Sequence, residues 1–258
     1  MSAWIELDGV RSDAFQGVMV TNVTPFIKAR KRATRTALAG RLGQIEEGEA
    51  TLETAEIAFD LNVHGDNRVS AVERARQLSP WLNGTMLRTY LEPDAYCTGA
   101  VETEVTGTKA SGRSLTLSCR FTANPGCMFY PPAGFTPSAA LPIPEQITAQ
   151  NASASGTFAA GGRLPVMQDG STYGPSLYFK ITGTWQQLAI GTLVVVDAFE
   201  ASDTLYIDCE NQVAYRFDGT QRANVAVSGS YPANDPAGIV VDGTGINVTV
   251  QALKIGRW

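Results

Sequence analysis

Residues 204–219 read TLYIDCENQVAYRFDG, and this stretch decides the fold class. Residues 204–209 and 213–217 are rich in aromatic and β-branched side chains, which favour strands. Residues 210–212, Glu-Asn-Gln, separate the two runs, and Asp218-Gly219 follows as a second turn signal. The pattern predicts an antiparallel hairpin.

The same spacing continues on both sides of this hairpin. Strand-like runs lie at 176–181, 188–196 and 223–227, with turn signals at 182–183 and 228–229. We expect one or two further strands in residues 238–255. Several short strands at this spacing are typical of a β-sandwich, so the C-terminal part is predicted to be one.

The N-terminal part is also predicted to be mainly β, with one helix. Strand-like runs lie at 4–9, 15–23, 50–63, 85–90, 96–105 and 114–121. Ser70 and Glu73 have the spacing of a capping box at the start of a helix. Pro80 is expected to kink or end that helix. One apolar stripe at helical spacing follows the cap, formed by Ala71, Ala75, Leu78 and Leu82.

A change of composition predicts a division of the chain. Six of the 13 prolines lie between positions 125 and 144, and NASASG at 151–156 is rich in small residues. Such stretches commonly connect domains. We therefore expect a first domain at 1–124, a connection at 125–162 and a second β domain at 163–258. An alternative is that 238–258 returns to supply the final strand of the first domain.

Composition excludes several classes of protein. The 258-residue chain is 44% hydrophobic and 17% charged, against roughly 25% charged in an average globular domain. Intrinsic disorder is excluded, because it requires few apolar residues and high charge. The longest strongly apolar run, 193–196, is far too short to cross a membrane. The start, MSAWIELD, lacks the features of a secretory signal. We expect no membrane insertion.

Positive charge is concentrated near the N-terminus. Residues 11–41 contain seven basic residues and one acid, although the whole chain has a net charge of -5. Most of these cations are arginines, which are favoured in protein interfaces. The alternative is a solvated basic loop. The candidates for an assembly interface are Lys28, Arg30, Lys31, Arg32, Arg35 and Arg41.

The sequence offers little material for catalysis. His64 is the single histidine, so a zinc site built on several imidazoles is excluded. No serine lies in a Gly-x-Ser-x-Gly motif, and the glycines form neither a P-loop nor a dinucleotide fingerprint. We expect His64 at a turn or strand end, and no cofactor or metal. Buried thiols, without metal or disulfides, are predicted for Cys97, Cys119, Cys127 and Cys209.

A group of acidic residues raises the hypothesis of a glycosidase, which uses two carboxylates and no metal. The candidates are Asp197, Glu200, Asp203, Asp208 and Glu210. Asp208 and Glu210 share a strand face only if the strand continues through Glu210. Because residues 210–212 are predicted to form the turn itself, we expect solvated carboxylates and no enzymatic activity.

Short motifs follow one another in a recognisable order over most of the chain. The first half contains Asp8-Gly9, Phe15-Gln16-Gly17, Gly40-Arg41-Leu42-Gly43, a helix closing at Trp81-Leu82, EPDAY at 92–96, and LSCRF at 117–121 before Asn124-Pro125. The second half contains Gly174-Pro175, KITG at 180–183, TLYIDCENQVAY at 204–215, SGSYP at 228–232 and Arg257-Trp258. In this order the motifs resemble those of the distal tail (Dit) proteins of long-tailed bacteriophages.

The resemblance implies a structural protein. Members of this family form a six-membered ring through a β-barrel or sandwich-like first domain with one helix, and carry a galectin-like jelly-roll second domain. The ring joins the tail tube to the tail-tip hub and supports receptor-binding or accessory proteins. The implied partners are further copies of this chain, the tail tube, hub and tape measure proteins, and receptor-binding proteins. The implied location is the distal end of the virion tail, after assembly in the host cytoplasm.

A carbohydrate-binding β-sandwich that recognises host-surface glycans is a second hypothesis. An aromatic side chain that exposes one face can stack on a sugar ring. Sequence-specific binding to nucleic acid is not expected, because the basic run lacks interleaved aromatics and the chain is acidic overall. The aromatic candidates for sugar contact are Tyr173, Tyr178, Trp185, Tyr206 and Tyr231.

Overall fold

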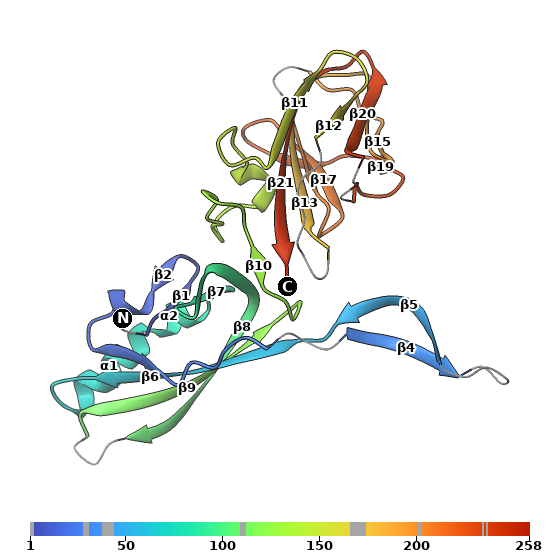
Figure 1. Cartoon of the computed structure of the whole chain (residues 1–258). Helices are drawn as coiled ribbons and strands as arrows, with labels where there is room; N and C mark the ends of the chain where they lie inside the picture. Colours follow the sequence, from blue (N-terminus) through green and yellow to red (C-terminus); the bar gives the residue numbers. More distant parts are fainter. Residues whose placement is uncertain are drawn as a thin grey trace. The chain divides into compact units, whose positions relative to one another are not determined.

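The computed structural model of the chain is mainly β, as the sequence predicts (Figure 1). It describes residues 3–27, 31–37, 44–108, 112–165, 174–200, 203–233, 235 and 237–258. The chain divides into two compact units: unit 1 is Met1–Phe129 and unit 2 is Tyr130–Trp258. Each is described by itself below.

Unit 1 consists of antiparallel strands joined through the long strand β8 (Glu92–Thr108). One half of β8 pairs with β7 (Met86–Thr89), which pairs with β1 (Ile5–Leu7) and then β2 (Val10–Arg11). The other half pairs with β9 (Ser114–Ala123), which pairs with β6 (Ala55–His64) and then β3 (Val18–Thr21). A short 3-10 helix, Ser12–Ala14, precedes β3. The predicted strands of this region are confirmed, except that the run at 50–63 is divided, with residues 50–52 in a separate strand that ends before β6 begins at Ala55.

Burial along β6 follows the two-residue period of a strand with one covered face. Ile57, Phe59, Leu61 and Val63 are buried, whereas the residues between them are exposed or partly exposed. The facing side chains of β9, from Leu115 to Phe121 at every second position, are buried as well. This alternation places the core of unit 1 on one side of the β6–β9 pair.

The predicted helix is present, but it begins earlier than expected. α1 spans Arg68–Gln77, and its N-cap is Asn67, whose side chain accepts a hydrogen bond from the Ser70 amide. Ser70 Oγ in turn accepts from the Asn67 amide. The predicted capping box, Ser70 with Glu73, was therefore wrong by one turn, because Asn caps helices as well as Ser does. α2 (Ser79–Leu82) follows, with Pro80 in its first turn.

A separate two-stranded sheet lies between β3 and β6 in sequence. β4 (Lys31–Ala37) pairs with β5 (Gln44–Leu52), and neither pairs with another strand of the described chain. The sequence predicted no strand in the basic part of this segment. Alternating threonine and long polar residues in β4 give little apolar periodicity, so the pattern carried no strand signal there.

Unit 2 is a sandwich of two antiparallel sheets. The larger consists of β18 (Arg222–Asn224), β17 (Val213–Phe217), β16 (Thr204–Asp208), β13 (Ser176–Thr184), β21 (Asn247–Arg257) and β11 (Ala154–Phe158), in that order. The smaller consists of β12 (Gly162–Leu164), β20 (Ile239–Thr244), β14 (Gln187–Ile190), β15 (Leu193–Val195) and β19 (Val227–Ser228). Leu177, Phe179, Leu188, Val241 and other buried apolar side chains fill the space between the sheets.

The stretch that predicted a hairpin forms one. β16 ends at Asp208 and β17 begins at Val213, so residues 210–212 lie in the turn. Gln212 has a φ of 54°, and the Asp208 carboxylate accepts hydrogen bonds from the amide and side chain of Asn211. The two strands formed by residues 238–258, β20 and β21, both pair with strands of unit 2.

The expected connection at 125–162 belongs largely to unit 2. Within it lie β10 (Phe129–Tyr130), a 3-10 helix η2 (Ile143–Gln146) and β11, which pairs with β21 over five residues. Ile147 is fully buried and Phe135 is 5% exposed. The small residues that suggested a linker instead form an edge strand, because pairing with β21 outweighs their low strand propensity.

Candidate assembly and binding surfaces

Three of the six basic candidates belong to a strand of the β4–β5 sheet. Lys31, Arg32 and Arg35 lie in β4, whereas Lys28, Arg30 and Arg41 lie outside the described residues. The register places Arg35 opposite Glu46 and Thr34 opposite Glu47. The basic strand thus pairs with an acidic one, a pairing that the charge count along the sequence did not reveal.

An apolar groove opens in unit 1 between the helices and the β8–β9 pair. Its volume is about 650 Å³. Val105 of β8 lines the groove and is 62% exposed. Arg68 and Arg76 of α1 also line it. The lining also includes Val72, Ala75, Leu82, Val101, Leu115 and Leu117.

The opposite face of the same sheet carries rows of hydrogen-bonded polar side chains. Ser114 Oγ lies 2.7 Å from His64 Nδ1, Thr116 donates to Asn62, and Ser118 donates to Asp60. His64 is the last residue of β6, so the predicted strand-end position is confirmed. Its ring is bonded to a buried serine, which gives this histidine a structural role.

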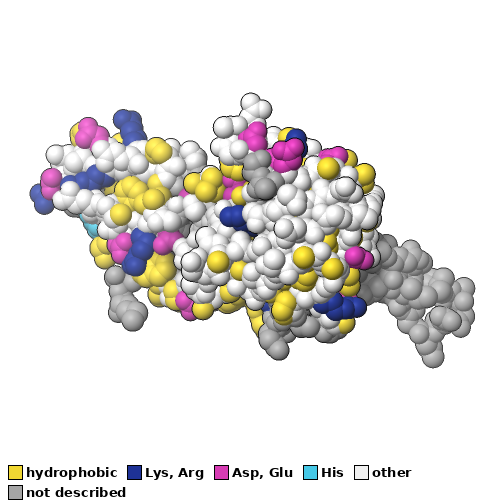
Figure 2. Space-filling view, turned by 90° about the horizontal axis from the view of Figure 1, so that it is seen from above, with side chains coloured by type: hydrophobic (Ala, Val, Ile, Leu, Met, Phe, Trp, Pro, Cys, Tyr) yellow, Lys and Arg dark blue, Asp and Glu magenta, His cyan; other side chains and the backbone are white. Residues whose placement is uncertain are grey.

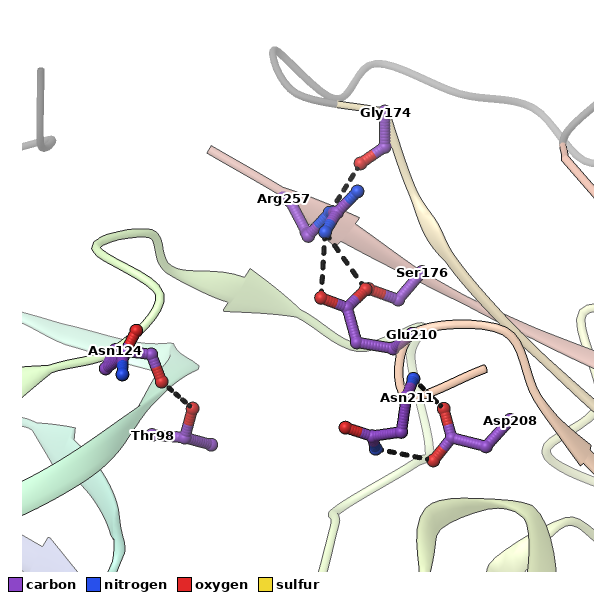
Figure 3. Close-up of polar contacts among 8 residues, drawn as sticks. All are labelled: Thr98, Asn124, Gly174, Ser176, Asp208, Glu210, Asn211 and Arg257. Carbon is purple, nitrogen blue, oxygen red and sulfur yellow. Dashed lines mark hydrogen bonds and ion pairs between the residues drawn. The ribbon is translucent and has the colours of Figure 1, made fainter. Parts of the chain in front are cut away.

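Figure 3 shows a polar cluster where the last strand of unit 2 meets the β16–β17 turn. Arg257 Nη1 lies 2.9 Å from both carboxylate oxygens of Glu210, and its Nε donates to the Gly174 carbonyl. Ser176 Oγ donates to Glu210 at 2.6 Å. A hollow of about 380 Å³ lies beside these residues, with Pro232 and Ala233 on its wall.

Most of the acidic candidates are engaged in structural contacts. Glu210 pairs with Arg257, and Asp208 is 9% exposed and caps the turn. Asp203 lies 3.5 Å from Arg216, and Asp197 accepts from the Ala226 amide at 3.4 Å. Glu200 is exposed. The prediction that residues 210–212 form the turn is confirmed, so Asp208 and Glu210 do not form a pair along one strand.

Three of the five aromatic candidates for sugar contact are buried. Tyr178, Trp185 and Tyr206 are 4%, 2% and 6% exposed, so none of them offers a free ring face. Trp185 stacks on Phe199 with a centroid distance of 4.3 Å. Tyr231 is partly buried against the core of unit 2, and Tyr173 lies outside the described residues. Alternation along a strand does not reveal that a face is covered by another segment.

In the view of Figure 2, the described residues form no patch that is basic alone. In Figure 2 the Lys and Arg side chains (dark blue) are interspersed with Asp and Glu side chains (magenta). Among the described residues, no group of three or more His, Cys, Asp or Glu side chains is placed to hold a metal ion. No helix in the described part of the chain is long and apolar enough to cross a membrane.

Comparison of the whole structure with solved structures shows a fold shared with a known protein. The chain matches no protein-family model and no curated protein by sequence. It superimposes on the Dit protein (gp 19.1) of phage SPP1 over 100% of both chains, with a TM-score of 0.61 and 12% identity. This chain has the Dit fold. The phage P2 baseplate structure matches over 98% of both chains at 12% identity, with a TM-score of 0.49.

The motif order in the sequence therefore predicted the Dit fold correctly. The SPP1 protein is described as a paradigm of the hub adsorption apparatus in phages that infect Gram-positive bacteria. On the Dit fold of this chain, sequence reasoning missed the groove of unit 1 and the Arg257–Glu210 pair. The sequence contained one indication of this pair, because Arg257 and Glu210 both lie in motifs on which the resemblance to Dit proteins rests.

Proposed function

We propose that this chain is the structural distal tail protein of a long-tailed phage. The observation that carries the proposal is the match to SPP1 Dit over the full length of both chains. In this role unit 1 forms a hexameric ring that joins the tail tube to the tail-tip hub. Unit 2 projects as a platform for receptor-binding or accessory proteins, at the distal end of the virion tail after assembly in the host cytoplasm.

The surfaces of unit 1 support a ring. A cyclic assembly uses heterologous contacts, so each copy must present two different patches. The apolar groove is one such patch, with exposed Val105 in its lining. The β4–β5 hairpin is another, since a two-stranded hairpin alone is only marginally stable in water. Its basic residues, from Lys28 to Arg41, are the proposed contact with a neighbouring copy or the tail tube.

The proposed partners are further copies of the chain, the tail tube protein, the hub protein, the tape measure protein and receptor-binding proteins. We propose no catalytic activity. Asp208 and Glu210, the acidic candidates nearest each other in sequence, are occupied by a turn and an ion pair, which supports a structural role for both.

Negative-stain electron microscopy of the purified chain tests the proposal. We expect rings with sixfold symmetry, and a strict monomer at high protein concentration would contradict the ring. The triple variant Arg30→Glu, Lys31→Glu, Arg32→Glu should reduce the ring fraction. The matched control exchanges cation types, Arg30→Lys, Lys31→Arg, Arg32→Lys, and should assemble as the original chain does. If both triple variants assembled equally well, residues 30–32 would not be part of the ring interface.

A second candidate function is glycan binding by unit 2. The hollow beside Ser176, Glu210 and Arg257 favours it, because carboxylate, guanidinium and hydroxyl groups can hydrogen-bond to sugar hydroxyls. Tyr231 precedes the Pro232 that lines this hollow. Binding of the full chain on a glycan array, lost in Tyr231→Ala, would support this function. An array without bound glycan would contradict it.

A further inference from the structure

The larger sheet of unit 2 has a face of tyrosines that is covered by the chain's own segment. Along β13, β16 and β17, Leu177, Phe179, Leu205, Ile207 and Ala214 belong to the core between the sheets. The alternating residues Tyr178, Tyr206 and Tyr215 therefore lie on the opposite, outer face. They are nevertheless only 4%, 6% and 7% exposed. Tyr206 and Tyr215 pair across the two strands and stack with a centroid distance of 5.4 Å.

A segment that we call the strap, residues 131–147, contributes to this cover. Its 3-10 helix η2 lies against β13 and β16, the strands that carry Tyr178 and Tyr206. Phe135 and Ile147 of the strap are buried. The described chain forms no strand between β10 and β11, so the strap is held without pairing to the sheet. Its five prolines are Pro131, Pro132, Pro137, Pro142 and Pro144.

One carboxylate fastens the strap to the sheet. Glu145 has a side chain only 7% exposed, and it accepts hydrogen bonds from Arg222 Nε at 2.5 Å and from Arg222 Nη2 at 2.9 Å. Tyr215 Oη donates to the same carboxylate at 3.0 Å. Lys180 Nζ adds a bond to the Ile147 carbonyl at 3.3 Å. Arg222 lies in β18, a three-residue edge strand, and its side chain is 49% exposed.

The strap keeps its own conformation through internal bonds. The Gln146 side chain accepts from the Ser138 amide and donates to the Ser138 and Leu141 carbonyls. The Asn151 side chain donates to the Gln146 carbonyl. Together with the prolines, these bonds reduce the conformational entropy that the segment loses when it lies on the sheet. The strap therefore resembles a preorganised ligand more than a random linker.

We propose that the outer tyrosine face of unit 2 is a recognition surface for a proline-rich segment with a glutamate, and that the strap is its resident and releasable occupant. Aromatic grooves are a recurrent way to bind proline-rich segments, because such segments are stiff before binding. Glu145 and Arg222 form the latch. When the latch opens, the 17-residue strap becomes a tether that spans at most about 60 Å in extended form. This inference does not rest on the proposed phage function.

Hydrogen exchange of the full chain tests the latch. The variants Glu145→Ala and Arg222→Gln each remove one side of the ion pair, and both should speed exchange of the amides of Ser138 and Ile147 by about tenfold or more. Glu73→Ala, an exposed glutamate on α1, is the matched control and should leave those amides unchanged. Strap amides that exchange at the original rate in both latch variants would overturn the proposal.

A peptide in trans tests the recognition surface. The probe is the labelled sequence of residues 137–149, PSAALPIPEQITA, added to the full chain. The Glu145→Ala chain has a loosened strap and an intact Arg222, so it should bind the probe at least about tenfold more tightly than the original chain. A probe with Gln in place of its Glu should bind weakly.

The Arg222→Gln variant distinguishes two requirements for probe binding, a tyrosine face that is uncovered and a cation that pairs with the glutamate of the probe. This chain should have a loosened strap but little affinity for the probe, because the cation that receives its glutamate is gone. Equal probe binding by Glu145→Ala and Arg222→Gln would contradict the role of the charge pair. Absence of probe binding to Glu145→Ala while its strap amides exchange rapidly would overturn the recognition surface. Arg222 is half-exposed on an edge strand, so its variant retains the fold on which the exchange test depends.

Discussion

Arg257 and Glu210 form an ion pair at the end of unit 2, with Arg257 Nη1 2.9 Å from both carboxylate oxygens. The pair connects the end of β21 to the turn between β16 and β17. The same carboxylate receives the Ser176 hydroxyl at the start of β13. The Arg257–Glu210 pair thereby connects three segments that are distant in sequence.

Arg257→Ala should destabilise unit 2. The change leaves a half-buried carboxylate without its cation, and we expect the free energy of unfolding to fall by about 1–3 kcal/mol. Hydrogen exchange of the amides in residues 204–217 measures the effect locally. Arg257→Lys keeps the positive charge but not the planar guanidinium group, so it should reduce the free energy of unfolding by less than Arg257→Ala does. Unchanged exchange in Arg257→Ala would contradict a stabilising role for the pair.

Unit 2 should lose stability in acid through Glu145. The hydrogen bond from Arg222 lowers the pKa of the Glu145 carboxyl, with a smaller contribution from Tyr215, against the opposing effect of burial. Below an ordinary pKa of 4.5 the unfolded chain binds a proton that the folded chain does not, so stability falls as the pH decreases through this range.

Urea unfolding between pH 6 and pH 3, about the range in which carboxyls titrate, measures this loss. Glu145→Gln removes the titrating group, so its unfolding curve should depend less steeply on pH than that of the original chain. An equal slope in the two chains would show that Glu145 does not contribute to the acid sensitivity.

Most strands of unit 2 were predictable because their signals are local. The predicted run 188–196, however, is divided into β14 and β15, and the run 223–227 is divided between β18 and β19. The hairpin of β16 and β17 has two β-rich runs around a polar turn, and both its strands and its turn lie where the sequence placed them. The edge strand β11 was missed, since Ala, Ser and Gly carry no strand signal and its pairing partner β21 lies almost a hundred residues further on. Strand propensity depends on the local sequence and contains no information on pairing between strands that are distant in sequence.

The candidate surfaces were less predictable than the fold. Tyr178 and Tyr206 have the alternation of residues on an outer face, but both are buried, and η2 of the strap lies against the strands that carry them. Likewise, the basic residues of β4 were visible in the sequence, but the acidic strand opposite them became apparent only from the register. Burial and cross-strand neighbours depend on tertiary packing, which residue counts do not contain.

The buried thiols should resist alkylation in the folded protein. Burial raises the pKa of Cys97 to about 12 and that of Cys119 to about 11, so few thiolates form at neutral pH. Cys127 is fully buried. We expect iodoacetamide to modify these three cysteines only after unfolding, as measured by mass spectrometry of peptides. Rapid modification of Cys97 in the native protein would contradict its burial.

Val105→Asp should impair ring assembly while leaving the isolated chain folded. Val105 is 62% exposed in the groove of unit 1, so a charge there costs the isolated chain less than about 0.5 kcal/mol. In a ring that covers the groove, the same charge would lose its water, and rings should become rare in light scattering and electron microscopy. The matched control is Val196→Asp in unit 2, where the valine is 57% exposed, and it should leave rings intact. If Val105→Asp assembled as the original chain does, the groove would lie outside the ring interface.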